Sequence, residues 1–131
     1  MQADSIIECV PNFSEGRNID IINQISQAIE GVPNVKLLNV DPGKSTNRTV
    51  ITFAGHPDDV IEAAFLAIKR ASELIDMRLH TGEHPRMGAT DVCPLIPVSG
   101  ISMAETVLYA QKLSERVGRE LQIPVYLYEA A

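Results

Sequence analysis

The sequence is poor in cysteine, has no excess of basic residues and contains no long apolar run. Its two cysteines, Cys9 and Cys93, have no C-x-x-C spacing, so neither a zinc knuckle nor a disulfide scaffold is indicated and we expect two free thiols. Acidic residues outnumber basic ones by 17 to 11, which argues against nucleic-acid or anionic-membrane binding. No run reaches the roughly 18 apolar residues of a membrane span, and residues 1–4 do not begin a signal peptide. We therefore expect a soluble, cytoplasmic protein.

A single domain over residues 1–131 is expected, because the length suits one domain and a 45% hydrophobic content can fill a core. Runs of β-branched and apolar residues predict strands at 5–10, 35–40, 48–54, 92–98 and 124–128. Apolar residues at helical spacing predict helices from Asn18 to Gly31, from Pro57 to about Asp76, and from a capping box at Ser102 to Leu121. The apolar seam of the last helix is expected at Val107, Ala110, Val117 and Leu121, with Ser114 in register.

The order of these elements predicts an α+β fold. Residues 44–47 are too few for a crossover, so the strands around them should pair antiparallel. The first six elements match a ferredoxin-like βαββαβ sandwich, to which a helix and a strand are added, with the helices on one face of the sheet. Residues 12–17 are rich in turn formers, and the prolines in 92–98 favour a strand near an edge.

Residues 80–94 concentrate imidazoles, carboxylates and a guanidinium in one loop shaped by glycine and proline. Residues 80–84 satisfy H-x-x-E-H, a zinc-peptidase pattern, but Gly82 and Pro85 oppose the helix that this pattern needs. A second interpretation is proton transfer by His84, oriented by Glu83 or Asp91. A third is structural, with Glu83 and Arg86 as an exposed ion pair and His84 as an ordinary loop residue.

Two further polar loops favour a functional interpretation. Residues 12–17 and 41–48 also carry short polar side chains, glycines and cations. If the three loops converge, Lys44, Arg48 and Arg86 would give this acidic protein local cations for an anionic ligand. Cys93, beside a proline in an apolar strand, is expected to be a buried small hydrophobe rather than a nucleophile.

Four separated blocks resemble the N-terminal subdomain of the glutamate formimidoyltransferase family, as found in formimidoyltransferase-cyclodeaminase. They are 10–16, 45–50, 82–94 and 125–128, in that order. The resemblance implies transfer of a formimino group from N-formimino-L-glutamate to tetrahydrofolate, the co-substrate, in histidine degradation and one-carbon metabolism. It also implies a ferredoxin-like subdomain with His84 as the catalytic histidine. No metal is expected, because Gly82 and Pro85 oppose the helix of the zinc pattern and the sequence singles out no third ligand.

The resemblance further implies that a C-terminal transferase subdomain, a separate partner chain or a homo-oligomer completes the site, with folate in the groove between the halves. From chemistry and placement, we expect Asp41 to orient the substrate or to stabilise the charge of its cationic amidinium end. We expect Arg48 and Arg86 to bind the carboxylates of the substrate. The full set of expected substrate- and folate-binding residues is Asn12, Asp41, Asn47, Arg48, Glu83 and Arg86. The alternative is a folate-binding or protein-interaction module without turnover of its own.

Overall fold

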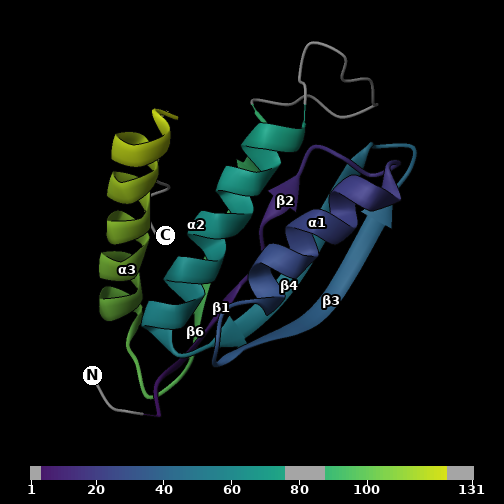
Figure 1. Cartoon of the computed structure of the whole chain (residues 1–131). Coiled ribbons are helices and arrows are strands. Elements are labelled where there is room, and N and C mark those ends of the chain that lie inside the picture. Colours follow the sequence, from purple (N-terminus) through teal and green to yellow (C-terminus); the bar gives the residue numbers. More distant parts are fainter. Residues whose placement is uncertain (1–3, 76–87, 124–131) are drawn as a thin grey trace.

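An antiparallel sheet covered on one face by helices forms the part of the chain that the computed structural model describes, residues 4–75 and 88–123 (Figure 1). The strands are β1 (Ile6–Cys9), β2 (Asn12–Phe13), β3 (Val35–Gly43), β4 (Arg48–Gly55), β5 (Thr90–Val92) and β6 (Leu95–Ser99). The helices are α1 (Ile19–Glu30), α2 (Pro57–Leu74) and α3 (Met103–Arg116), and a π-helical turn, η2 (Val117–Leu121), continues α3. The expected α+β class is confirmed.

Strand β4 organises the sheet. It pairs antiparallel with β3 on one side, and with β1 and β2 in succession on the other. Strands β6 and β5 then pair with the outer edges of β1 and β2. The predicted antiparallel hairpin around residues 44–47 is therefore confirmed, with Gly43 opposite Arg48.

Proline interrupts two of the strands without changing their register. Asn12 lies opposite Val50, where a direct continuation of the Cys9–Phe53 pairing would place it. Pro11 separates β1 from β2, and Pro94 lies between β5 and β6. Proline has no backbone N–H and cannot donate to a ladder, so the regular pairing stops at each one. Their carbonyls still accept hydrogen bonds, from Ile51 N to Pro11 and from Val10 N to Pro94, both at 3.1 Å.

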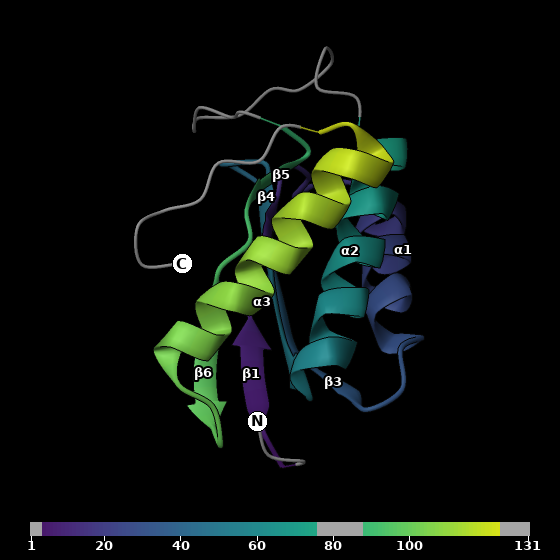
Figure 2. The same ribbon diagram turned by 90° about the vertical axis from the view of Figure 1, so that its left-hand side faces the viewer.

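The helices cover the face of the sheet to which alternate residues of β4 point. Thr49, Ile51 and Phe53 are buried there, whereas the residues between them are only partly buried. Helix α2 occupies the middle of the helical layer, between α1 and α3 (Figures 1 and 2). Its buried face carries alanines, whose small side chains allow neighbouring backbones to approach closely: Ala63, Ala64, Ala67 and Ala71. The opposite face of the sheet is called the open face below, and no described helix covers it.

Local signals place the helix starts where the sequence predicts them. Asn18 caps α1 by accepting hydrogen bonds from two backbone N–H groups of the first turn, and Gly31 follows its last residue. Pro57 is the first residue of α2, which ends at Leu74 rather than near Asp76. Ser102 forms the predicted capping box at α3.

The structure corrects four expectations about element limits and packing. Asn12 and Phe13 form a strand and not a turn, because they pair with both β4 and β5. Strand β3 continues to Gly43, since its hairpin ladder with β4 extends to the turn. The single strand expected at 92–98 is two strands separated at Pro94. The buried seam of α3 is rotated from the expected one and consists of Thr106, Tyr109, Ala110 and Leu113, with Val117 following in η2.

The strand expected at 124–128 lies outside the described residues. Among the residues that are described, no helix is both long and apolar enough to cross a membrane.

Candidate functional site

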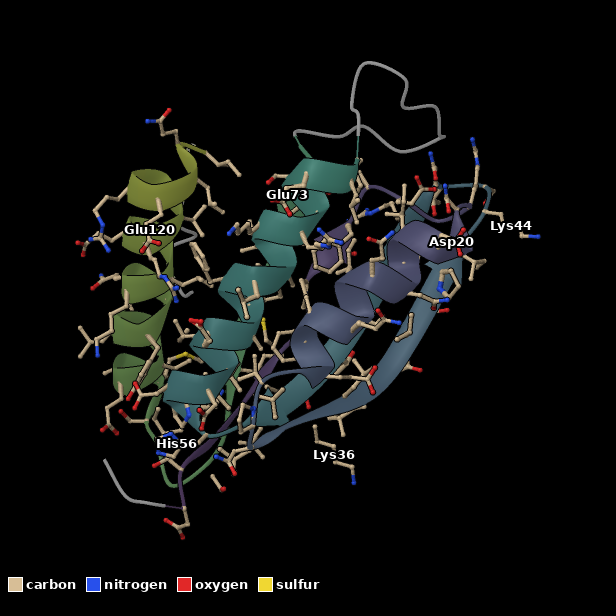
Figure 3. The ribbon with its side chains drawn as sticks, in the orientation of Figure 1. Asp20, Lys36, Lys44, His56, Glu73 and Glu120 are labelled. Carbon is tan, nitrogen blue, oxygen red and sulfur yellow. The ribbon has the colours of Figure 1, made fainter. Side chains whose placement is uncertain are left out.

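Three polar loop regions, each including adjoining strand residues, meet at one end of the sheet. They are residues 12–17, the hairpin tip at 43–48, and residues 88–91, which belong to the described part of the loop predicted at 80–94. Ser14 joins the first to the third through hydrogen bonds from its N–H to Ala89 O at 2.8 Å and from its hydroxyl to Gly88 O at 2.7 Å. Arg17 joins the first to the second, because its Nε donates to Lys44 O at 2.8 Å. Lys44 itself lies at the end of the molecule opposite to Lys36 and His56 (Figure 3).

An arginine links one residue from each of two loops. The Nη2 of Arg48 donates to Asn12 Oδ1 and to Asp91 Oδ2, each at 3.0 Å. The Arg48 and Asp91 side chains are only 18% and 14% exposed, so this charge-assisted contact is partly shielded from water. We call Asn12, Arg48 and Asp91 the Arg48 cluster. It provides a cation, an anion and an amide in one small region of an acidic protein.

A bulge brings Asp91 into this cluster. Thr90 pairs with Phe13 and Val92 pairs with Asn12, so Asp91 is an extra residue between two residues that are adjacent on the partner strand. Such a bulge re-aims a side chain relative to the regular alternation of the strand. The ion pair to Arg48 is its observed consequence.

Asn47 holds the hairpin tip against the first loop. Its backbone is left-handed, with φ of 52°, a conformation that asparagine tolerates better than most residues. Its buried Oδ1 accepts the N–H of Gly16 at 2.8 Å. Gly16 has no room for a side chain, because a Cβ there would lie 2.2 Å from Gly43 O and 2.6 Å from both N and O of Arg48. The contact thus depends on glycine at this position.

The predicted residues Asp41 and Asn12 occupy one row across the open face. Both lie directly opposite Val50, one on each side of β4. Residues directly opposite one another in an antiparallel sheet point to the same side, and Arg48, two residues before Val50, points there as well. Asp41 is exposed and Asn12 half-buried. The structure therefore brings together Asn12 and Arg48 by a hydrogen bond, and Asp41 by register. Asn47 is held to the first loop through Gly16.

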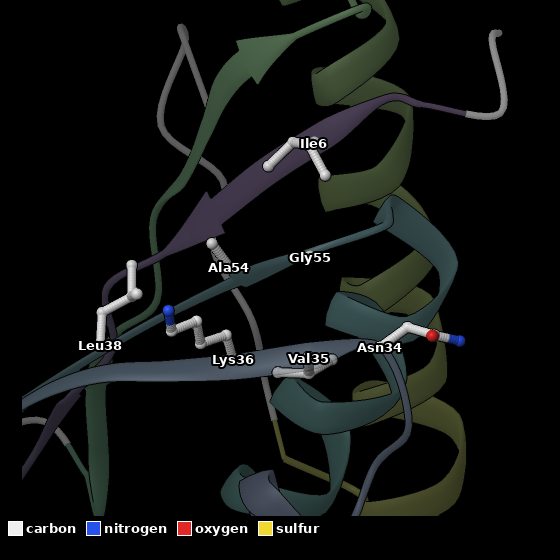
Figure 4. A pocket seen from close by; sticks show the side chains of 7 residues that line it. All are labelled: Ile6, Asn34, Val35, Lys36, Leu38, Ala54 and Gly55. Carbon is white, nitrogen blue, oxygen red and sulfur yellow. The ribbon is translucent and has the colours of Figure 1, made fainter.

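The other end of the open face is apolar. A shallow hollow of about 410 Å³ lies there (Figure 4), and its described lining is Ile6, Asn34, Val35, Lys36, Leu38, Ala54 and Gly55. Ala54 is four residues from Val50, which places the hollow about 13 Å along the strand from the Asp41–Asn12 row. Leu38, Ile96 and Val98 of the edge strands β3 and β6 are 48%, 43% and 56% exposed. The hollow and the polar cluster are therefore distinct regions of one face.

Three predicted site residues, Glu83, His84 and Arg86, lie outside the described residues, as does the whole H-x-x-E-H pattern. Residues 4–75 and 88–123 contain no group of three or more histidines, cysteines or acidic residues that could hold a metal ion.

Sequence reasoning missed two contributors to this region. The sequence indicates Asp91 only as a partner for a histidine, because its pairing with Arg48 across 43 positions has no local signal. Ser14 has no sequence signal beyond its polar loop, yet it holds that loop to residues 88 and 89 through two hydrogen bonds. Thr90 Oγ1, next to Asp91, is buried without a hydrogen-bond partner among the described residues.

The sequence matches the family model described as the formiminotransferase domain, N-terminal subdomain, over residues 6–131. The formimidoyltransferase-cyclodeaminase of Rattus norvegicus is 60% identical over 126 residues, which are 96% of this chain and 23% of that protein. The glutamate formimidoyltransferase of Thermoplasma acidophilum is 51% identical over 127 residues, 97% of this chain and 42% of that protein. This chain spans less than half the length of either relative. The match confirms the resemblance seen in the sequence: the chain belongs to the family of N-terminal subdomains of the formiminotransferase domain.

Proposed function

We propose that this chain, as one domain over residues 1–131, supplies the N-terminal half of a glutamate formimidoyltransferase site. The reaction is transfer of a formimino group from N-formimino-L-glutamate to tetrahydrofolate, in histidine degradation and one-carbon metabolism. The supporting observation is the convergence of three polar loops on the Arg48 cluster in a chain 51% identical to a protein named glutamate formimidoyltransferase.

In the proposed reaction, N5 of the folate attacks the amidine carbon of the substrate. The new C–N5 bond gives a tetrahedral intermediate, which collapses as the bond from carbon to the glutamate nitrogen breaks. The N5 proton must leave and the departing nitrogen must gain one, so a single imidazole at His84 can perform both transfers. Tetrahydrofolate enters as a co-substrate, and no metal takes part in this proposal.

The remaining residues bind and position. The substrate and the folate both carry glutamate carboxylates, which suit the guanidinium groups of Arg48 and Arg86. The Nη2 of Arg48 already donates to Asn12 and Asp91, so these two residues fix its orientation. Asp41, exposed on the same face, suits the cationic amidine end of the substrate.

Asn47 and Glu83 complete the proposed set of binding and positioning residues. The Oδ1 of Asn47 accepts the Gly16 N–H, so its role here is to hold the hairpin tip in place. Glu83 neighbours His84 in sequence and is proposed to orient it or to contact the substrate.

The open face is the proposed docking side for a second half, with the folate held in the groove between the two. Its exposed apolar side chains, Leu38, Ile96 and Val98, support this role. The second half can be a C-terminal subdomain, a separate chain or a second copy in a homo-oligomer, and the longer relatives favour the first. No nucleic acid or membrane partner is proposed, and free thiols suit the proposed cytoplasmic location.

A ferredoxin-like βαββαβ arrangement is proposed for the subdomain itself. Counting β1 with β2, and β5 with β6, as one interrupted strand each reduces the sheet to four strands. The β1–β2 strand, first in the chain, then lies between β4, which is third, and the β5–β6 strand, which is fourth. The second strand, β3, lies on the far side of β4. This order supports the ferredoxin-like interpretation.

The decisive experiment measures turnover of formiminoglutamate and tetrahydrofolate by a chimera in which this chain is joined to the C-terminal half of the Thermoplasma acidophilum relative. His84→Ala is expected to lower kcat about 10²–10⁴-fold, the range for positioned proton transfer. His56→Ala is the matched control, because His56 occupies the N-cap position of α2 without a capping hydrogen bond from its side chain, at the end of the molecule opposite to Lys44. It should leave kcat within a factor of two. Near-normal turnover of His84→Ala would end its catalytic assignment.

The second candidate is a folate-binding or interaction module, favoured by the small share of the relatives that the chain covers. Tetrahydrofolate binding to the isolated chain, measured by calorimetry, combined with an inactive chimera would support this candidate over the transferase. An active chimera would exclude it.

A further inference from the structure

The two cysteines of the chain lie side by side although they are 84 positions apart. Their sulfur atoms are 3.4 Å apart. Cys9, the last residue of β1, is fully buried, and Cys93, between β5 and β6, is partly exposed. The distance between the sulfurs exceeds a disulfide bond of about 2.05 Å by little more than 1 Å.

The backbone holds the two thiols in this position. Cys9 lies opposite Leu95 in the β1–β6 ladder, and Cys93 is two residues before Leu95, so the cysteines are diagonal neighbours on adjacent strands. The hydrogen bond from Val10 N to Pro94 O, 3.1 Å long, fixes the strands between them. The sulfur atoms must therefore approach by little more than 1 Å, through side-chain rotation together with a small shift of the strand segments at Cys9 and Cys93.

We propose that Cys9 and Cys93 form an oxidative modification site, which a peroxide converts into an intramolecular disulfide. Peroxide first oxidises the Cys93 thiol to a sulfenic acid and is itself reduced to water. The Cys9 sulfur then attacks the Cys93 sulfur, the S–O bond breaks, and the hydroxyl departs with the Cys9 proton as a second water. One peroxide thus removes two electrons and two protons, which together are two hydrogen atoms, from the pair.

The environment of the thiols sets the order of these steps. Cys93 is the accessible partner. Burial, together with the neighbouring thiol, raises the pKa of Cys9, so Cys9 is poorly suited to meet the oxidant first. Its position 3.4 Å from the Cys93 sulfur is what lets it resolve a sulfenic acid formed there. Cys93 therefore takes the peroxide and Cys9 closes the bond.

Disulfide formation would act next to the Arg48 cluster. Cys9 precedes Asn12 by three residues and Cys93 follows Asp91 by two. The cross-link would fasten β1 to the β5–β6 junction and close a loop of 84 residues in the unfolded chain. Constraining so long a loop disfavours the unfolded state, so the oxidised protein should melt at a temperature higher by roughly 5 °C or more.

The test treats the purified chain with hydrogen peroxide and follows free thiols and intact mass. The expected result is a fall from two titratable thiols to none, loss of two hydrogen atoms, and a Cys9–Cys93 linked peptide in a non-reducing digest. Dithiothreitol should restore both thiols and the original melting temperature. Cys93→Ser, at a partly exposed position, should retain one thiol at Cys9 and show no oxidant-dependent rise in melting temperature.

Cys9→Ala provides a second variant. Without a resolving thiol, its Cys93 should continue to sulfinic acid, which dithiothreitol does not reverse. Three results would overturn the proposal: two thiols that persist under peroxide, sulfinic acid at Cys93 of the unsubstituted chain with Cys9 still reduced, or dimers linked through Cys93. These readouts are independent of transferase activity.

Discussion

Gly16→Ala tests whether the contact between the first loop and the hairpin tip holds the candidate site together. A Cβ at Gly16 would lie 2.2 to 2.6 Å from three atoms, Gly43 O, Arg48 N and Arg48 O. All three belong to the backbone, so no side-chain rotation can relieve the overlap. The loop must move away from β4, and the buried hydrogen bond from Gly16 N to Asn47 Oδ1 must lengthen or break.

The size of the effect follows from three contributions. Forcing an extra methyl group into a filled site costs about 1–3 kcal/mol, and a lost hydrogen bond costs about 1 kcal/mol. Alanine restricts the unfolded chain more than glycine does, which offsets about 0.4–1 kcal/mol. Because the backbone neighbours place the packing cost in the upper part of its range, we expect a net decrease in the free energy of unfolding of about 2–3 kcal/mol.

Gly31→Ala is the matched control, since it adds the same methyl group at an unobstructed position. Gly31 ends α1 with an ordinary helical φ of −71°, and the nearest atom to an added Cβ is Gln27 O at 3.4 Å. We expect no loss of stability, and a gain of up to about 1 kcal/mol. The chain has no tryptophan, so urea unfolding is followed by far-ultraviolet circular dichroism. A free energy of unfolding for Gly16→Ala within about 0.5 kcal/mol of that of the unsubstituted chain would refute the reasoning.

Two further predictions concern the helical layer. Arg116→Ala should lower the free energy of unfolding by about 1 kcal/mol, because its guanidinium donates to Glu62 at 2.6 Å and lies 3.7 Å from the centre of an aromatic ring of α2. Arg119→Ala removes only contacts on the helix surface, so it should change the free energy of unfolding by less than about 0.5 kcal/mol in the same urea titration. Equal decreases for the two variants would contradict a stabilising role of the Arg116 contacts with α2. The hydrogen bond from the backbone N–H of Ser102 lowers the pKa of Glu105. The stability that ionised Glu105 contributes is therefore fully present above its pKa in the unfolded chain, and it is lost as pH falls through its pKa in the folded chain. Between about pH 7 and pH 3, the free energy of unfolding of Glu105→Gln should therefore fall less than that of the unsubstituted chain. Equal decreases would show that ionised Glu105 does not stabilise the start of α3.

Helix starts and the central hairpin could be predicted because their causes are local. Asn18 and Ser102 accept hydrogen bonds from backbone N–H groups within one turn, and Pro57 has a fixed φ that suits the first helical position. The sequence window around each residue therefore contains the whole effect. The linker at 44–47 constrains its two strands by its length alone. Such elements need no knowledge of the rest of the chain.

Interrupted strands could not be predicted in the same way. Pro11 followed by polar residues is typical of a loop, yet β2 forms because β4 and β5 supply hydrogen-bonding partners on both sides. The same limit applies to the seam of α3, which depends on how the helix packs against α2 and β6. In both cases the tertiary partners, and not the local residues, decide the outcome.

In the candidate site, the sequence could predict the segments involved but not the contacts between them. Chemistry-bearing residues could be assigned to three loops, and Asn12, Asn47 and Arg48 do lie together. The ion pair of Arg48 with Asp91 depends on a single bulged residue in a three-residue strand, and no periodicity reveals a bulge. Residue types therefore predicted the region, whereas its internal contacts required the register of the sheet.

That register also connects the two proposals. Because β1 and β2 keep one alignment along β4 despite Pro11, the cysteine at the end of β1 and the asparagine at the start of β2 have fixed positions relative to Arg48. Residues 90–95 follow the same two strands on their other side and carry Asp91 and Cys93. A disulfide between the cysteines would thus restrain the two segments that orient Arg48, so the oxidation state of the thiols can influence the site without contact to a substrate.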